Sequence, residues 1–324
     1  MARTRYAPDR GLSVRMTLTM FLLGLVFVAF VALIIGIMSA AHVSAGAIIL
    51  VAIIFGGGSA FVSLFYSDKI ALAAAGAQEV SPRDSEQAAR LHGIVDRLCA
   101  LADMDKPRVA IAPGPIMNAF ATGRNSKNSV LCVTQPLLNQ LDNDELEGVL
   151  AHELSHVAHK DVQVMTYASL LAIVAGLLVR FAFYSELFGG GRRNNNNDSG
   201  ALVILGIMVV SAVIYAISFL LIRLLSRYRE LAADRSGALL TGQPSALKSA
   251  LQKVSGSMTR IPTQDLRAAE PLNAFYFAPA LNLRDPKASL AKLFSTHPTL
   301  ERRIEELDKI QRQLGQIDPG PKAL

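Results

Sequence analysis

Tryptophan is absent from the sequence, and only 6% of its 324 residues are aromatic. Charged residues are also scarce: they make up 18% of the chain, whereas soluble domains carry about 25%. Apolar residues nevertheless account for 51% of the chain, so the excess is aliphatic. This balance argues against a purely soluble protein. It favours a soluble region joined to several membrane spans.

Cysteine is nearly absent as well. Only Cys99 and Cys132 occur, which excludes a disulfide framework, and we expect reduced, buried thiols in a cytoplasmic domain. The net charge is +6, but no basic patch interleaved with aromatic residues and no nucleic-acid module is visible. We therefore predict no nucleic-acid partner and attribute the excess of Lys and Arg to the flanks of membrane spans.

Long stretches without charge predict four transmembrane helices. No Asp, Glu, Lys or Arg lies between Arg15 and Asp68, and this stretch is too long for one span. A cleaved signal peptide is the alternative at its start, but the apolar core is too long for one. The predicted spans cover residues 16–39, 46–66, 162–185 and 199–222.

The positions of Lys and Arg predict the orientation of these spans. Basic residues precede the first and third spans and follow the second and fourth, whereas the opposite side has only Arg192 and Arg193. We expect both termini and both polar regions in the cytoplasm. The predicted parts are a basic segment (1–15), a transmembrane hairpin (16–66), a polar region (67–161), a second hairpin (162–225) and a second polar region (226–324).

A zinc-binding pattern ends the first polar region. His152, Glu153 and His156 lie in a stretch of helical periodicity that follows a capping signal at residues 142–145. Histidines four residues apart share one helix face, so both rings can reach one Zn²⁺. Glu153 can then act as general base on a zinc-activated water. The alternative is a chance pair of surface histidines.

A catalytic zinc site needs a third protein ligand and one open position. Val162 excludes the metzincin spacing, and His159 lies a turn too far along the helix, which leaves it a supporting role. Glu230 is the better candidate; Asp234 follows four residues later, and one of the two would ligate while the other orients an imidazole. His156 and Glu230 each lie about eight residues from an apolar core, so straight helices would place both about 12 Å outside the bilayer.

The order of these motifs resembles that of the HtpX family, bacterial membrane zinc endopeptidases related to the CAAX prenyl proteases. The resemblance covers most of the chain, from about residue 12 to residue 308. It implies one zinc ion per chain, ligated by His152, His156 and Glu230, with Glu153 as catalytic base. The matching segments are residues 118–123, 152–156, 230–234, 296–298 and 303–304.

Further roles follow from the same resemblance. His297 would stabilise the oxyanion, although a histidine before Pro298 at a helix start is the alternative reading. Arg303 is a candidate partner of Asp234, with a solvated helix face as the alternative. An edge strand would pair with the extended substrate backbone, or would be a plain strand and turn. Its residues are Asn118, Ala119, Phe120 and Ala121.

The leading hypothesis is therefore a multi-pass metalloprotease of the bacterial inner membrane that degrades misfolded or damaged membrane proteins under stress. We expect a mainly α fold, with four transmembrane helices and a cytoplasmic zincin-like α+β catalytic domain that has a small edge-exposed sheet. Its partners would be the lipid bilayer and membrane-protein or peptide substrates; no oligomeric state is predicted. Two alternatives stay open: a selective CAAX-type or regulatory membrane protease, and a non-catalytic zinc-stabilised scaffold with a closed, four-ligand site. A channel is disfavoured because the spans hold almost no ionisable residues.

Overall fold

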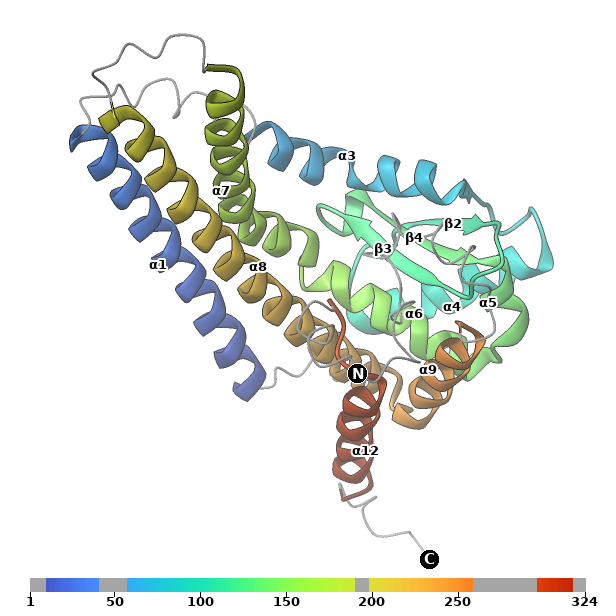
Figure 1. Ribbon diagram of the computed structural model, residues 1–324. Coiled ribbons are helices and arrows are strands. Elements are labelled where there is room, and N and C mark those ends of the chain that lie inside the picture. The colour runs from blue at the N-terminus through green and yellow to red at the C-terminus, as the bar shows by residue number, and fades with distance from the viewer. Residues whose placement is uncertain (1–9, 41–56, 190–197, 259–295, 317–324) are drawn as a thin grey trace, which may run out of the picture. The chain divides into compact units, whose positions relative to one another are not determined.

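The computed structural model describes residues 10–40, 57–189, 198–258 and 296–316 (Figure 1). The chain divides into two compact units. One, the helical unit, comprises residues 14–64 and 163–225. The other, the sheet unit, comprises residues 1–13, 65–162 and 226–324. The sheet unit contains every site residue predicted above.

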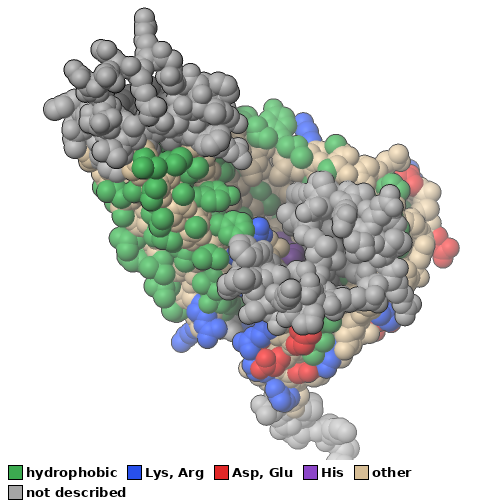
Figure 2. All heavy atoms as spheres, in the orientation of Figure 1, with side chains coloured by type: hydrophobic (Ala, Val, Ile, Leu, Met, Phe, Trp, Pro, Cys, Tyr) green, Lys and Arg blue, Asp and Glu red, His purple; other side chains and the backbone are tan. Residues whose placement is uncertain are grey.

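Three helices among the described residues are long and apolar enough to cross a membrane. They are α1 (Arg10–Ala40), α7 (Asp161–Gly189) and α8 (Asp198–Thr241). In the helical unit they share a buried cluster in which Phe30, Ala175 and Leu225 take part. Large hydrophobic side chains also point outward from α1 and α8, and Figure 2 shows them over the visible face of this unit. Outward apolar side chains suit contact with lipid.

The second predicted span, residues 46–66, is not confirmed. Most of it lies outside the described residues, and helix α3 (Gly58–Ala75) covers only its end. This helix continues past the predicted boundary at Tyr66 and is not among the candidate spans. Asp68 and Lys69 lie in the middle of α3, which explains why its composition differs from that of a span. The described residues thus show three candidate spans rather than four.

The sheet unit is built on four strands in the order β1-β2-β4-β3. They are β1 (Gln78–Glu79), β2 (Arg108–Ala112), β4 (Ser129–Thr134) and β3 (Ala119–Gly123). Strand β2 pairs with β4 in parallel, and the two outer strands pair antiparallel to their neighbours. Strand β3 therefore lies at one edge of a small mixed sheet, with Ala121 opposite Leu131.

Alternating apolar residues give this sheet two buried faces. In β4, Val130 and Cys132 point toward α3, where Ala71 belongs to the same cluster. Leu131 and Val133 point to the opposite face and join the main core. That core contains α4 (Glu86–Ala102) and α6 (Asn143–Ala158), so the sheet lies between α3 and these two helices (Figure 1). A strand with both faces covered explains the continuous apolar run in β4.

Further helices complete the main core. Helices α9 (Pro244–Met258) and α12 (Leu300–Gln316) contribute Leu251 and Ile310, and α5 (Gln135–Gln140) follows β4. A single 3₁₀ turn, Ser126–Asn128, precedes β4. Cys99 and Cys132 are free and buried. The main core thus joins α6 to segments that follow the second predicted hairpin in sequence.

Candidate metal centre

Helix α6 begins where the sequence predicts it. The Asp142 carboxylate accepts a hydrogen bond from the Glu145 backbone N–H (2.9 Å), and the Asp142 N–H donates to the Glu145 carboxylate (3.1 Å). This capping box satisfies two backbone donors at the helix start. The helix is buried on most sides: His152 is 1% and Glu153 is 4% exposed. Two of the three side chains of the zinc pattern, His152 and Glu153, therefore lie inside the protein.

Helix α8 passes close to α6 at the first histidine. Glu230 and Asp234 lie one turn apart on α8, and both are buried. Gly237 follows one turn later, and a Cβ added there would lie 2.8 Å from the backbone nitrogen of His152. A larger residue at position 237 would push the two backbones apart. The lack of a side chain therefore lets α8 approach closely enough to present its carboxylates to α6.

Three donors meet at one point. The Nε2 atoms of His152 and His156 are 3.2 Å apart, and Glu230 carboxylate oxygens lie 3.7 Å and 3.6 Å from them, respectively. Zinc at about 2.0–2.1 Å from each donor would require tetrahedral edges of about 3.3–3.4 Å. The observed separations are close to that value. The donor set and its spacing therefore fit a zinc ion, and these three side chains form a group capable of holding a metal.

The ring of His152 is held from behind by a buried ion pair. Its Nδ1 lies 2.9 Å from the Asp234 carboxylate, which also accepts two hydrogen bonds from Arg303 (2.6 Å and 2.7 Å). Burial lowers the pKa of His152 to about 4, which keeps the ring neutral. A proton on Nδ1 then leaves the lone pair of Nε2 for a metal. Arg303 pairs with Asp234 as the sequence suggested, and its side chain is buried rather than solvated.

The ring of His156 has a similar support that sequence reasoning missed. Its Nδ1 lies 2.7 Å from the carboxylate of Asp161, the first residue of α7. Asp161 forms an ion pair with Arg229, which donates a further hydrogen bond to the His159 carbonyl (2.9 Å). The available signal was an aspartate just beyond the end of the zinc-pattern helix. His159 itself caps α6 and lies outside the three-donor group.

Glu153 faces the open edge of the sheet. The Ala121 backbone N–H donates to the Glu153 carboxylate (3.1 Å), and burial raises the pKa of this carboxyl to about 8. Residues of an antiparallel strand direct their backbone groups alternately toward and away from the partner strand. The Asn118 carbonyl accepts a hydrogen bond from the Thr134 backbone N–H at the end of β4. The backbone groups of Asn118 and Phe120 therefore face β4. Ala119 and Ala121 therefore direct their backbone groups toward the open edge.

His297 also reaches the three-donor group. Its Nδ1 lies 3.0 Å from a Glu230 carboxylate oxygen, and the side chain is buried. The residue directly precedes Pro298 at the approach to α12. The structure therefore brings His297, Arg303 and Asp234 to the two histidines, although these residues come from distant parts of the sequence.

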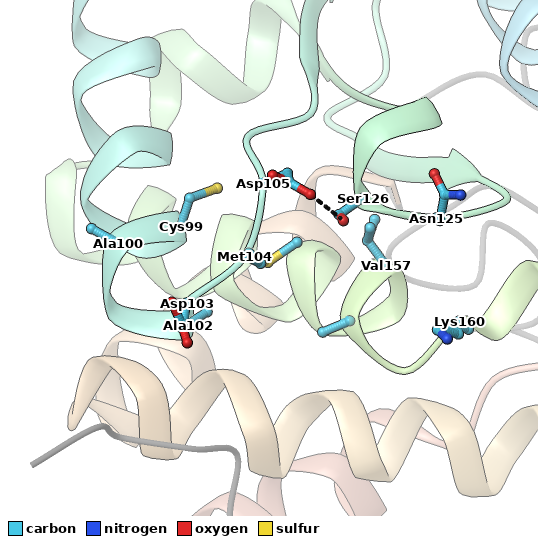
Figure 3. A pocket seen from close by; sticks show the side chains of 11 residues that line it. Cys99, Ala100, Ala102, Asp103, Met104, Asp105, Asn125, Ser126, Val157 and Lys160 are labelled. Atoms are coloured by element: carbon cyan, nitrogen blue, oxygen red, sulfur yellow. Dashed lines mark hydrogen bonds between the residues drawn. The ribbon is translucent and has the colours of Figure 1, made fainter.

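A separate pocket of about 630 Å³ lies at the ends of α4 and α6 (Figure 3). Cys99 lines it from α4, Asp103 from the cap just after α4, and Lys160 from the residues just after α6. Ser126 donates a hydrogen bond to Asp105 in the same pocket (3.2 Å). None of the predicted site residues lines this pocket, so it is distinct from the three-donor group.

Comparisons with known proteins agree with this geometry. Residues 85–311 match Peptidase family M48. The chain belongs to this family. It is 53% identical to Protease HtpX homolog 1 of Streptomyces coelicolor over 99% of this chain and 100% of the relative. It is 48% identical to the Protease HtpX homolog of Moorella thermoacetica, over 96% of this chain and 98% of that relative. The resemblance to the HtpX family is thereby confirmed.

A solved structure shows a similar fold. The crystal structure of S. mikatae Ste24p matches 91% of this chain and 67% of its own, with a TM-score of 0.54 and 18% identity. At this identity the likeness concerns the fold alone. Together with the apolar helices, these relatives identify an HtpX-type peptidase of family M48 that is associated with a membrane.

Proposed function

We propose that this protein is an integral-membrane zinc metalloendopeptidase that hydrolyses peptide bonds of misfolded or damaged membrane proteins. One observation carries the proposal. His152, His156 and Glu230 offer three donors at separations close to those of a tetrahedral zinc site, and both imidazole rings are oriented by carboxylates. The described residues supply three donors, which leaves a fourth position for water or substrate.

The three donors would hold one zinc ion per chain. Zinc in such a site supplies Lewis-acid chemistry: it makes water more acidic and polarises a carbonyl group. Asp234 and Asp161 hold the ring protons of His152 and His156, which would leave both Nε2 lone pairs to bind the ion. The charge on Glu230 offsets part of the charge on the metal.

Glu153 is the proposed general base. Its carboxylate would accept a proton from the attacking water and deliver it to the leaving nitrogen of the cleaved bond. The hydrogen bond from Ala121 keeps the carboxylate beside the open edge of β3. A substrate backbone paired with that edge would therefore lie within reach of the base.

The open edge of β3 is the proposed substrate site. An extended peptide can add to a sheet edge through backbone hydrogen bonds, and the backbone groups of Ala119 and the carbonyl of Ala121 face outward. The Ala121 N–H already donates to Glu153. Asn118 and Phe120 would support this strand from the β4 side. His297, whose Nδ1 lies 3.0 Å from a Glu230 oxygen, would donate a hydrogen bond to the oxyanion that forms on the attacked carbonyl.

The three candidate spans support substrates that are themselves bound to the membrane. We further propose four spans, with residues 46–66 forming one of them, and a zincin-like catalytic domain built from residues 67–161 and 226–324. The Lys and Arg bias favours an active site and both termini on the cytoplasmic side of a bacterial inner membrane. The names of the relatives, Protease HtpX homolog, agree with a protease, and we propose that it acts in quality control under stress.

Zinc loading combined with a base variant tests the proposal. The full chain in detergent micelles is stripped with a chelator, reloaded with zinc and assayed on a model membrane protein. We expect one zinc ion per chain in the wild type and in Glu153→Gln, because Glu153 is not a donor. We expect cleavage by Glu153→Gln to fall by about 10²–10⁴-fold, which is the usual contribution of a general base.

Two results would overturn the proposal. Wild-type protein that binds no zinc would remove the metal centre, and wild-type cleavage by Glu153→Gln would remove the assigned base. Sequencing of the products separates general degradation from a selective protease, since the latter cuts at one defined site.

A further inference from the structure

An exposed apolar patch lies on one side of α3. Phe65, Tyr66 and Ile70 are 45%, 44% and 51% exposed, and Lys69 lies among them. These four residues are called the α3 patch. Among the described residues of the sheet unit, the only other large hydrophobic side chain this exposed is Leu101, at 40%. Apolar exposure in the described part of this unit is thus concentrated on about one turn of one helix, which marks an interaction surface.

The opposite side of α3 is fixed to the sheet. Ala71 is fully buried there, and Leu72 and Ala75 pack against the same cluster as Cys132 of β4. Asp68 forms an ion pair with Arg108 at the start of β2. Because residues one turn apart share a helix face, these contacts direct the α3 patch away from the sheet. The helix cannot bury the patch by rotating without losing them.

Two cations lie over the aromatic rings of the patch. The Lys69 ammonium is 5.5 Å from the centre of the Tyr66 ring, and the Arg124 guanidinium is 4.7 Å from that of Phe65. Rings and aliphatic side chains flanked by cations suit the boundary between lipid headgroups and acyl chains. The chain reaches α3 directly from the uncharged stretch before Asp68. These features favour lipid over a protein as the occupant.

We infer that the α3 patch lies in the headgroup region of the bilayer and holds the sheet unit at the membrane surface. Under the span proposed for residues 46–66, the patch begins where that span ends, at the level where Tyr and Lys side chains meet the lipid headgroups. Arg124 directly follows Gly123, the last residue of β3. The patch is therefore joined to the end of the strand whose open edge, under the proposed function, receives substrate. A segment leaving the bilayer would meet this edge at the surface.

The absence of tryptophan makes a direct test available. Tyr66→Trp and Ile70→Trp each give a full-length protein with one tryptophan, and Leu101→Trp is the matched exposed control. Each variant is reconstituted into vesicles of phosphatidylcholine and phosphatidylglycerol, with bromine near either the carbonyl or the methyl end of the acyl chain. We expect strong quenching and blue-shifted emission at positions 66 and 70, greatest with bromine near the carbonyl end. Position 101 should keep the unquenched emission of an exposed indole.

The inference would be overturned if lipid quenching at positions 66 and 70 were no greater than at position 101. That result is also expected if protein, rather than lipid, covers the patch.

A second measurement needs no fluorophore. Ile70→Asn should slow cleavage of a membrane-anchored substrate several-fold and leave cleavage of a soluble peptide unchanged, whereas equal loss on both would overturn the inference. Quenching does not depend on activity, so this result stays separate from that of the proposed function.

Discussion

The two histidines of the candidate metal centre are supported by similar groups in different surroundings. Each ring donates to an aspartate, and each aspartate is paired with an arginine. The support of His152, made by Asp234 and Arg303, is almost completely shielded from solvent. In the support of His156, the side chains of His156 and Asp161 are 16% and 11% exposed. Solvent therefore reaches one support and hardly reaches the other.

The partners of the two arginines differ as well. Arg303 places its guanidinium on Asp234 in a two-point contact, and the nearest Glu230 oxygen is 3.8 Å away. Arg229 also donates to the His159 carbonyl at the end of α6, where a cation suits the helix dipole. The support of His152 by Asp234 and Arg303, called the inner support, thus both orients a metal-binding ring and stabilises the core. The support of His156 by Asp161 and Arg229, called the outer support, acts mainly, we propose, on the orientation of the His156 ring.

The largest effect is expected for Asp234→Asn. This change removes the two-point ion pair between Arg303 and Asp234 and leaves only the longer contact of Arg303 with Glu230, at 3.8 Å. Breaking a buried ion pair in this way costs about 3–5 kcal/mol of folding free energy. Loss of the carboxylate behind His152 should also weaken zinc binding about 10- to 100-fold. Thermal unfolding of the metal-free full chain and chelator competition measure the two effects. Unchanged unfolding would show that the inner support does not stabilise the core.

Asp161→Asn should separate zinc binding from stability. We expect zinc affinity to fall about 10- to 100-fold, because His156 loses its orienting carboxylate. The free energy of unfolding should fall by only about 1–2 kcal/mol, because Arg229 keeps the His159 carbonyl as a partner. The rate of zinc release to a coloured chelator gives the first value. If the folded variant released zinc at the wild-type rate, the proposed role of Asp161 would be contradicted.

The double variant Asp161→Asn with Arg229→Gln sharpens the distinction. Removing both charges leaves no unpaired ion, so unfolding of the metal-free protein should return to within about 1 kcal/mol of the wild type. Zinc release should stay as fast as in Asp161→Asn alone, because the carboxylate is still missing. Recovery of both properties would mean that the pair is structural only.

The smallest effect is expected for Asp308→Asn, the matched control. Asp308 pairs with Lys248 at 2.8 Å and also joins two helices, but both side chains are partly exposed and neither belongs to the three-donor group. Exposed pairs contribute about 0–1 kcal/mol, so unfolding should change little. Zinc release should equal that of the wild type. A change in zinc release would show that any loss of an ion pair between helices disturbs the centre.

The sequence predicted the elements whose signals are local. The capping box of α6 needs residues three apart, and the two histidines need only helical spacing. Spacing alone left open whether Glu230 or Asp234 would ligate, because both lie on one face of one helix, and the choice of Glu230 came from the family resemblance. The structure places Glu230 beside both Nε2 atoms and Asp234 behind the His152 ring. That difference depends on how α8 crosses α6, and the spacing of residues within one helix does not predict how two helices cross.

The edge strand shows the same limit on local patterns. Residues 118–121 were predicted as one substrate-binding segment, and β3 does lie at the sheet edge. The register with β4 divides the segment in two, since alternate residues face the partner strand and the open edge. Register depends on pairing with another strand, so sequence analysis of the segment alone did not separate Ala121 from Phe120.

The sequence by itself determined the apolar spans that the structure describes, the start of α6, the zinc pattern and the family. These properties depend on composition and on the spacing of residues within one segment. Only the tertiary structure decided that Asp234 supports His152 and that Asp161 and Arg229 support His156, because these residues come from different helices. Their meeting requires close packing of α8 on α6, where Gly237 lies against the backbone of His152.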